Sequence, residues 1–220
     1  MFGFFKKKKK GAEVMQLRGF PGDIGTLKCL IMAAEKNIKL DIAVLDVEND
    51  AHKQADYLKI SPFGKYPYIQ EDDAIAIGAE AALAYLDTRG NGFFNPKKAQ
   101  FFGHQNYWWQ VAESINDDIQ VMLNEAASSK QVGSADKIKI EKVLDELDAF
   151  LSGKKFIVGE YSYADVHWTA NLYALEVSGH KELIEARPNI TGWYTKVKQR
   201  PSIATLPTLE DIKQKQLNAA

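Results

Sequence analysis

The hydrophobic periodicity of this chain changes once, near residue 90, and that change limits the folds it can adopt. Upstream, short apolar segments with strand character alternate with helical patterns, whereas downstream the apolar patterns have the spacing of a helix. Between the two parts, Arg89–Gly90–Asn91–Gly92 and Asn95–Pro96 supply stop signals. The sequence therefore predicts an α/β domain followed by an all-α domain.

The first part opens with a strand, a helix and a second strand. Residues 13–19 alternate apolar and polar side chains and end at a glycine, and residues 40–45 repeat this strand character. Between them lie apolar residues at helical spacing: Leu27, Leu30, Ile31, Ala34 and Ile38. Such a unit generally makes a right-handed crossover between parallel strands.

A short polar helix over residues 50–59 and a hairpin complete the first part. The hairpin strands are residues 66–69 and 74–77, and Pro67 is tolerated because it stands at the start of its strand. Residues 79–86 are rich in strong helix formers. The predicted order is therefore β-α-β-α-β-β-α.

The second part contains several amphipathic helices. One apolar stripe runs from Trp108 to Leu123 and another from Ile140 to Leu151, with a loop over residues 128–134 between them. Residues 162–165 have the pattern of a capping box, and a late helix ends at Arg200–Pro201. We assign the chain as follows: a basic tail at 1–12, the α/β domain at 13–88, a linker at 89–96 and the all-helical domain at 97–220.

Lys6 to Lys10 are five consecutive lysines that conceal an acidic body. Without these five, the 28 basic residues fall to 23, against 29 acidic residues. A groove for nucleic acid would need a basic patch, so we expect no nucleic-acid partner. The segment from Phe2 to Lys10 has two interpretations: a solvated tail, or a weak membrane contact through its lysines and phenylalanines.

The chain has neither an apolar run of the ~18 residues that a membrane span needs nor the pattern of a secretory signal. Its one cysteine, Cys29, permits neither an intrachain disulfide nor a cysteine metal cluster, and its position inside a helix predicts a buried filler. Neither His104 nor His167 has a second ligand at helical spacing, so we expect no metal site. These features favour a cytoplasmic protein.

Several local motifs resemble those of the cytosolic glutathione transferases, in a form nearest to the phi class. They are HKQ at 52–54, ISPFGKYP at 60–67, FIVGEYSYAD at 156–165, and RP at both 187–188 and 200–201. The resemblance covers roughly residues 13–204. It implies a thioredoxin-like domain joined to a helical domain, glutathione as co-substrate, and conjugation of glutathione to hydrophobic electrophiles in detoxification. It also implies a homodimer in which the helix after Gly78 meets the helix after Lys97 of the other subunit.

The resemblance also implies where glutathione would lie. A cis proline at position 67 would turn the backbone of Tyr66 outward, where an extended peptide can pair with it. His52 and Lys53 would meet the glycyl carboxylate. The residues implied to contact glutathione are His52, Lys53, Lys65, Tyr66, Pro67, Ala79 and Glu80.

The chain departs from the family pattern at the sulfur. Asp23 falls where phi-like enzymes carry the serine that stabilises the thiolate, and an ionised carboxylate there would raise the pKa of the thiol. Thr26 is the nearest hydroxyl. Asp23 and Thr26 are therefore the candidate catalytic residues.

A second departure concerns the γ-glutamyl end of glutathione. Gly78 and Ala79 occupy the positions of the acid and serine that grip this group in the family. Glu80 is one residue away, but a helix turns by ~100° per residue, so its side chain should point elsewhere. The unpaired N–H groups of the helix start could still hold a carboxylate.

These departures leave two functions open. The first is a glutathione transferase, and the alternative is a non-catalytic member of the same fold that binds a ligand or another protein. Tyr107, Trp108 and Trp109 either line an inter-domain cleft for a hydrophobic small molecule or belong to the core, and for Trp108 we favour the core.

Overall fold

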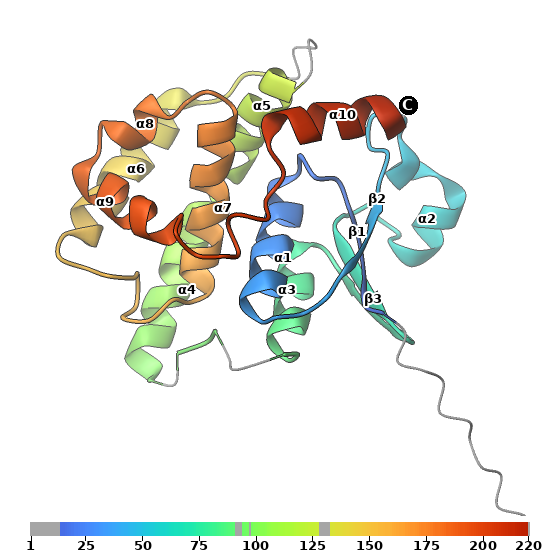
Figure 1. The fold of residues 1–220 in the computed structure, drawn as a ribbon, viewed down its shortest axis with the longest axis horizontal. Helices are drawn as coiled ribbons and strands as arrows, with labels where there is room; N and C mark the ends of the chain where they lie inside the picture. The colour runs from blue at the N-terminus through green and yellow to red at the C-terminus, as the bar shows by residue number, and fades with distance from the viewer. Residues whose placement is uncertain (1–13, 91–93, 97, 128–132, 220) are drawn as a thin grey trace, which may run out of the picture.

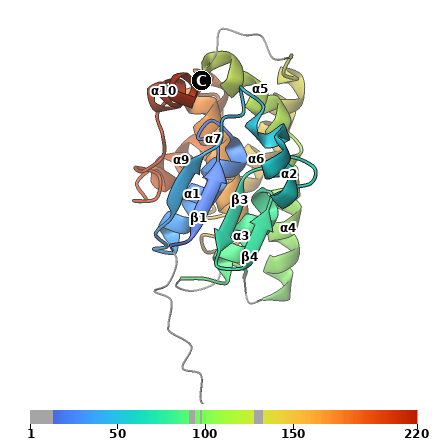
Figure 2. The same ribbon diagram turned by 90° about the vertical axis from the view of Figure 1, so that its right-hand side faces the viewer.

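The computed structural model describes residues 14–90, 94–96, 98–127 and 133–219. A four-stranded mixed sheet lies at the centre of the first part, with strand order β2-β1-β3-β4 (Figures 1 and 2). Strand β2 runs parallel to β1, whereas β3 is antiparallel to both β1 and β4. The strands are β1 (Gln16–Gly19), β2 (Asp41–Val44), β3 (Tyr68–Glu71) and β4 (Ala74–Ile77).

Three α-helices accompany this sheet. Helices α1 (Ile24–Glu35) and α3 (Ala79–Asp87) lie on one face, and α2 (Ala55–Ile60), preceded by a 3₁₀ turn at Ala51–Lys53, lies on the other (Figure 1). The expected thioredoxin-like order β-α-β-α-β-β-α is confirmed.

The rest of the described chain is helical, as expected for an α/β plus all-α protein. Its helices are α4 (Ala99–Glu113), α5 (Asn116–Ala127), α6 (Lys137–Leu151), α7 (Tyr163–Val177), α8 (Glu182–Glu185), α9 (Pro188–Val197) and α10 (Leu209–Ala219). None of the helices in the described ranges is both long and apolar enough to cross a membrane.

The apolar stripe from Trp108 to Leu123 belongs to two helices rather than to one. The break lies at Ser114, whose N–H is shared between the carbonyls of Gln110 and Val111 and whose hydroxyl donates to Val111 at 2.7 Å. This local bonding tightens the last turn of α4, and the ladder of α5 restarts from the carbonyl of Ile115. Both helices keep the apolar side of the stripe buried.

Helix α7 is the most deeply buried helix of the helical part, and the predicted capping box at its start is confirmed. The carboxylate of Asp165 accepts the Ser162 N–H at 2.9 Å, the Ser162 hydroxyl at 2.8 Å and the Ile157 N–H at 3.1 Å. Because Asp165 is fully buried, these three bonds replace the water it loses on folding.

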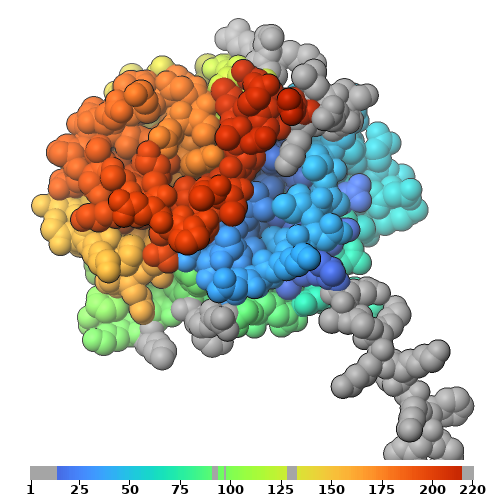
Figure 3. All heavy atoms as spheres, viewed as in Figure 1, coloured from blue at the N-terminus to red at the C-terminus, as the bar shows by residue number. Residues whose placement is uncertain are grey.

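The two parts of the chain share one hydrophobic core, with α1 packed between α3 and α7. Residues near the C-terminus lie directly against the α/β part (Figure 3). There Arg200 donates to the two carboxylate oxygens of Glu35 at 2.6 and 2.5 Å, and the Ser202 hydroxyl donates to the same group. The predicted basic tail, including Phe2 to Lys10, is outside the described residues.

Candidate functional site

The starts of α1 and α3 converge on the loop that precedes β3. The Tyr66–Pro67 peptide bond is cis, as the sequence predicted. A β-carbon at Gly25 would lie 3.0 Å from Asp23 Oδ2, 3.0 Å from the Ala79 β-carbon and 3.1 Å from Pro67 Cδ. Three candidate residues that are far apart in sequence therefore meet around Gly25, whose missing side chain permits the close approach.

Asp23 is the N-cap of α1. Its half-buried carboxylate accepts the Thr26 N–H at 2.6 Å and the Thr26 hydroxyl at 2.8 Å. Burial raises the pKa of Asp23, and the hydrogen bonds from Thr26 oppose that rise. Thr26 is fully buried and its hydroxyl donates to Asp23, so this hydroxyl has no proton left to donate to a thiolate.

Gln120 of α5 fastens this corner to the helical part. Its side-chain oxygen accepts the Ile24 N–H at 2.8 Å, and its amide nitrogen donates to the Gly22 carbonyl at 2.7 Å. The N–H groups of Thr26 and Leu27 also have acceptors, since Thr26 donates to the Asp23 side chain and Leu27 to the Asp23 carbonyl. Sequence reasoning missed Gln120, which has no local motif and lies 96 residues from Ile24.

The residues assigned to the glycyl end of glutathione differ in their surroundings. The His52 ring lies edge-on to Tyr66, with centroids 5.5 Å apart, and its Nδ1 is buried with no partner among the described residues. Lys53 is exposed and paired with Asp50 at 2.8 Å. Lys65 is also exposed. His52 is therefore the member of this group with an unused polar atom beside Tyr66.

The start of α3 is open at its N-cap. Gly78 adopts a φ of +86°, a conformation that favours glycine, and it gives the helix no side-chain cap. Ala79, which contacts the Gly25 position, is only partly buried. This end of the site offers backbone N–H groups in place of the acid and serine implied by the family resemblance.

Glu80 belongs to a different group of polar side chains at the joint between the two parts. Its Oε2 lies 3.7 Å from His167 Nε2 on α7. His167 Nδ1 lies 2.8 Å from Glu113 Oε1 on α4, and Lys28 of α1 is ion-paired to the same Glu113 oxygen. The structure places Glu80 against the helical part.

Burial and charge shift the pKa values in this group in different directions. Burial raises the pKa of Glu80 to about 7 and lowers that of His167 to about 4. Burial also opposes ionisation of Glu113, but the hydrogen bond from His167 and the charge of Lys28 outweigh it and hold its pKa at about 2. Glu113 is therefore the ionised partner of the Lys28 ammonium.

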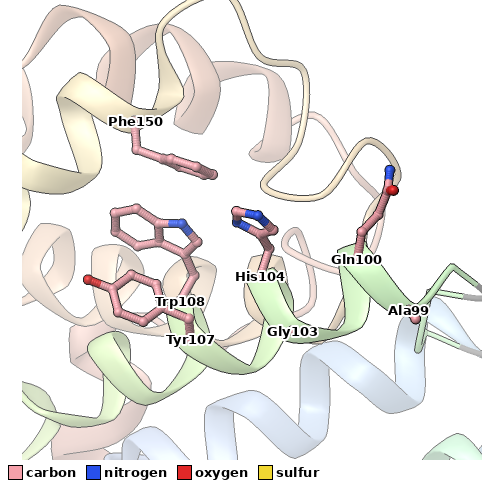
Figure 4. Close-up of a pocket in the computed structure, with 7 residues that line it drawn as sticks. All are labelled: Ala99, Gln100, Gly103, His104, Tyr107, Trp108 and Phe150. Atoms are coloured by element: carbon pink, nitrogen blue, oxygen red, sulfur yellow. The ribbon is translucent and has the colours of Figure 1, made fainter.

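The three aromatic residues at 107–109 have separate roles. Trp108 is 6% exposed and belongs to the core, as favoured, whereas Tyr107 is 60% exposed. Both line an open pocket of about 530 Å³ between α4 and Phe150 of α6, within the helical part (Figure 4). Of the two interpretations, the core holds for Trp108, whereas Tyr107 lines a pocket within the helical part and not an inter-domain cleft. Trp109 lies near the joint, 5.6 Å from the His167 ring.

Cys29 is fully buried, which confirms its interpretation as a filler. Burial raises the pKa of its thiol, and the negative charge of Asp23 adds to that rise. The charge of Asp23 therefore raises the pKa of a nearby thiol, which is the effect we expect it to have on the thiol of glutathione.

The pKa shifts of Glu80 and His167 predict opposing effects of pH on stability. The folded-state pKa of Glu80, about 7, exceeds its usual 4.5, so its contribution is present below pH 4.5 and is lost as the pH rises through 7. The folded-state pKa of His167, about 4, is below its usual 6.5, so its contribution is present above pH 6.5 and is lost as the pH falls through 4.

Each variant should remove one of these slopes from the wild-type profile. Relative to wild type, we expect the free energy of unfolding of Glu80→Gln to rise as the pH increases from 4.5 to 7, and that of His167→Gln to rise as the pH falls from 6.5 to 4. Urea titrations at a series of pH values measure both slopes. His104→Gln, at an exposed histidine of α4, should keep the wild-type profile. Slopes of the same sign in the first two variants would contradict this account.

Two family models match the chain. The model described as glutathione S-transferase, N-terminal domain, matches residues 13–88, and the one described as glutathione S-transferase, C-terminal domain, matches residues 118–206. Together they span most of the α/β part and most of the helical part.

Curated relatives and solved structures agree with these models. Glutathione S-transferase F13 of Arabidopsis thaliana is 26% identical over 205 residues, which cover 86% of this chain and 92% of the relative. Glutathione S-transferase APIC of Nicotiana tabacum is 22% identical over 204 residues, covering 86% and 94%.

Among solved structures, glutathione transferase F7 of Populus trichocarpa superposes with a TM-score of 0.75 at 24% identity, covering 92% of this chain and 99% of its own. Glutathione transferase BmGSTD1 of Bombyx mori has a TM-score of 0.78 at 17% identity, covering 93% and 97%. At this identity the superpositions show the fold, while the two family models show the ancestry. The chain belongs to the cytosolic glutathione S-transferase superfamily, and its plant relatives include members of the phi class.

Proposed function

We propose that this chain binds glutathione at the corner formed by the starts of α1 and α3 and transfers it to hydrophobic electrophiles in the cytoplasm. The observation that carries the proposal is the meeting of Asp23, Pro67 and Ala79 around Gly25. In this arrangement the open start of α3 holds the γ-glutamyl carboxylate through its N–H groups. We assign the glycyl carboxylate to His52, whose ring lies beside Tyr66 and whose Nδ1 has no partner among the described residues.

The chemical step needs the glutathione thiol to lose its proton to solvent, after which the thiolate attacks an electrophilic carbon. As the C–S bond forms, either the bond from that carbon to a leaving group such as a halide breaks, or the electron pair of an activated double bond moves away from it. Asp23 opposes this step, because a carboxylate beside the sulfur raises the pKa of the thiol and donates no hydrogen bond when ionised. We therefore infer that binding is better supported than rapid turnover.

A non-catalytic ligand-binding or protein-interaction function is the second candidate. It is favoured because the hydrogen-bond donors near Asp23 already have partners within the protein. The Thr26 hydroxyl donates to Asp23, and the Ile24 N–H donates to Gln120. A thiolate placed beside Asp23 would have to compete with these bonds.

Calorimetric titration with glutathione separates the two candidates. We expect heat of binding and thermal stabilisation, and we expect Ala79→Ser to tighten binding by about 1 to 2 kcal/mol because its hydroxyl can bond to the γ-glutamyl carboxylate. Gly78 is left unchanged, because its φ of +86° would strain a side chain there. Ala84→Ser, at an exposed position of α3, is the matched control. If millimolar glutathione produces no heat of binding and no thermal stabilisation, the second candidate is favoured.

If the chain conjugates glutathione, Asp23 should limit the rate. Asp23→Ser should increase turnover by roughly one to two powers of ten, because a hydroxyl can donate to the thiolate. Turnover is measured with an aromatic electrophile and compared with Asp136→Ser, which changes the N-cap of α6 in the same way. A lower turnover in Asp23→Ser would show that the carboxylate contributes positively.

We also propose that the chain forms a homodimer through α3 of one subunit and α4 of the other. Helix α4 presents two exposed aromatic side chains, Phe102 at 47% and Tyr107 at 60%, and Tyr107 lines the pocket of Figure 4. Exposed aromatic side chains next to an apolar pocket are typical of a surface that another chain covers.

Tyr107→Asp should therefore shift the protein toward the 24.7 kDa monomer, because the interface would have to bury a charge. Analytical ultracentrifugation at micromolar concentration measures this change. Ile138→Asp, at an 80% exposed residue of α6, is the control and should leave the wild-type mass unchanged. A wild-type mass that is already monomeric would contradict the proposed dimer.

A further inference from the structure

Glu80, Glu113 and His167 form a cluster that the proposed glutathione site does not use. The three residues come from α3, α4 and α7, and one possible ligand atom from each lies within 4.8 Å of the others. The spacing of these residues along the chain gives no metal motif, since each is supplied by a different helix. The fold, rather than a local pattern, brings them together.

One nitrogen of this cluster is buried without a partner. His167 is fully buried, and its Nε2 has no hydrogen-bond partner in the described structure. The Glu80 carboxylate lies beside this nitrogen and also interacts with the Trp109 side chain. The 3.7 Å between His167 Nε2 and Glu80 Oε2 is too long for a hydrogen bond. It is close to the ~3.4 Å that separates two ligands each ~2.1 Å from one tetrahedral zinc ion.

The hydrogen bond to Glu113 sets the histidine up as a ligand. Because an ionised Glu113 can only accept, His167 Nδ1–H donates to its Oε1 at 2.8 Å, and this tautomer leaves a lone pair on Nε2, 3.7 Å from Glu80 Oε2. A carboxylate behind a histidine whose other nitrogen binds the metal is a common arrangement in zinc sites. Tyr163, stacked on the His167 ring at 6.3 Å between centroids, helps to fix its plane.

The charges and the exposure of the cluster also suit a divalent cation. Lys28 offsets the charge of Glu113, so an ionised Glu80 leaves the cluster with one net negative charge. The Glu80 side chain is 42% exposed, so this ligand of the site is in contact with solvent. The Lys28 ammonium repels a cation and should therefore weaken its binding.

We propose that this cluster is a zinc site in which Glu80 and His167 Nε2 bind the ion, Glu113 orients the histidine, and water completes the coordination. Mixed nitrogen and carboxylate ligands suit zinc among the divalent metals. This proposal is independent of glutathione, because the site faces the helical part of the chain.

The test uses full-length, untagged protein that has been stripped with a chelator. Calorimetric titration with Zn²⁺ should show one ion per chain, and Co²⁺ should give the visible absorption of a low-coordinate site. Glu80→Gln and His167→Asn should each lose this binding. His104→Gln, which changes an exposed histidine of α4, should retain it.

Two further variants separate a metal site from a metal-free ion-pair network. Lys28→Met should tighten Zn²⁺ binding, because it removes the repelling charge, and Glu113→Gln should weaken it by about 10- to 100-fold. No binding to the wild-type protein, or equal binding in Glu80→Gln and wild type, would overturn the proposal. The wild-type cobalt spectrum does not depend on whether a variant folds, and a spectrum unchanged from free aqueous Co²⁺ would overturn the proposal as well.

Discussion

The burial of α1 on all sides is the constraint on which the rest of this structure depends. Nine of its twelve residues are buried, including Lys28, and Lys36 at its C-cap is also buried. A buried ammonium is costly unless a carboxylate meets it, so Glu113 must be in place for Lys28, and Asp87 for Lys36. One partner comes from the helical part and one from α3, so folding of α1 requires both.

The candidate site inherits its geometry from the same helix. Asp23 caps α1, and Gln120 holds the first amide of α1 while also bonding to the carbonyl of Gly22. The corner that we assign to glutathione is therefore set by a residue of the helical part. The position of Asp23, next to the expected sulfur, therefore depends on the contact that Gln120 makes between the two parts of the chain.

The sequence predicted what depends on local pattern. Periodicity identified the strands and most of the helices, and the N-cap pattern identified the capping box, whereas the cis proline came from the family resemblance. It missed what depends on pairs distant in the chain, such as Gln120 with Ile24 and Lys28 with Glu113, because no spacing rule relates such residues. The break at Ser114 was missed for another reason: the apolar stripe continues through it, and only a side-chain hydrogen bond marks it.

The bidentate salt bridge between Arg200 and Glu35 has a consequence for how such a chain can be divided or recombined. It joins the end of α1 to a segment 165 residues later, so the α/β part is closed by residues from the far end of the chain. If the α/β part were excised, the apolar face of α1 toward α7 would be bare and Lys28 would lose its carboxylate. The two parts therefore form one folding unit, in which neither part can be exchanged without the contacts that the other supplies.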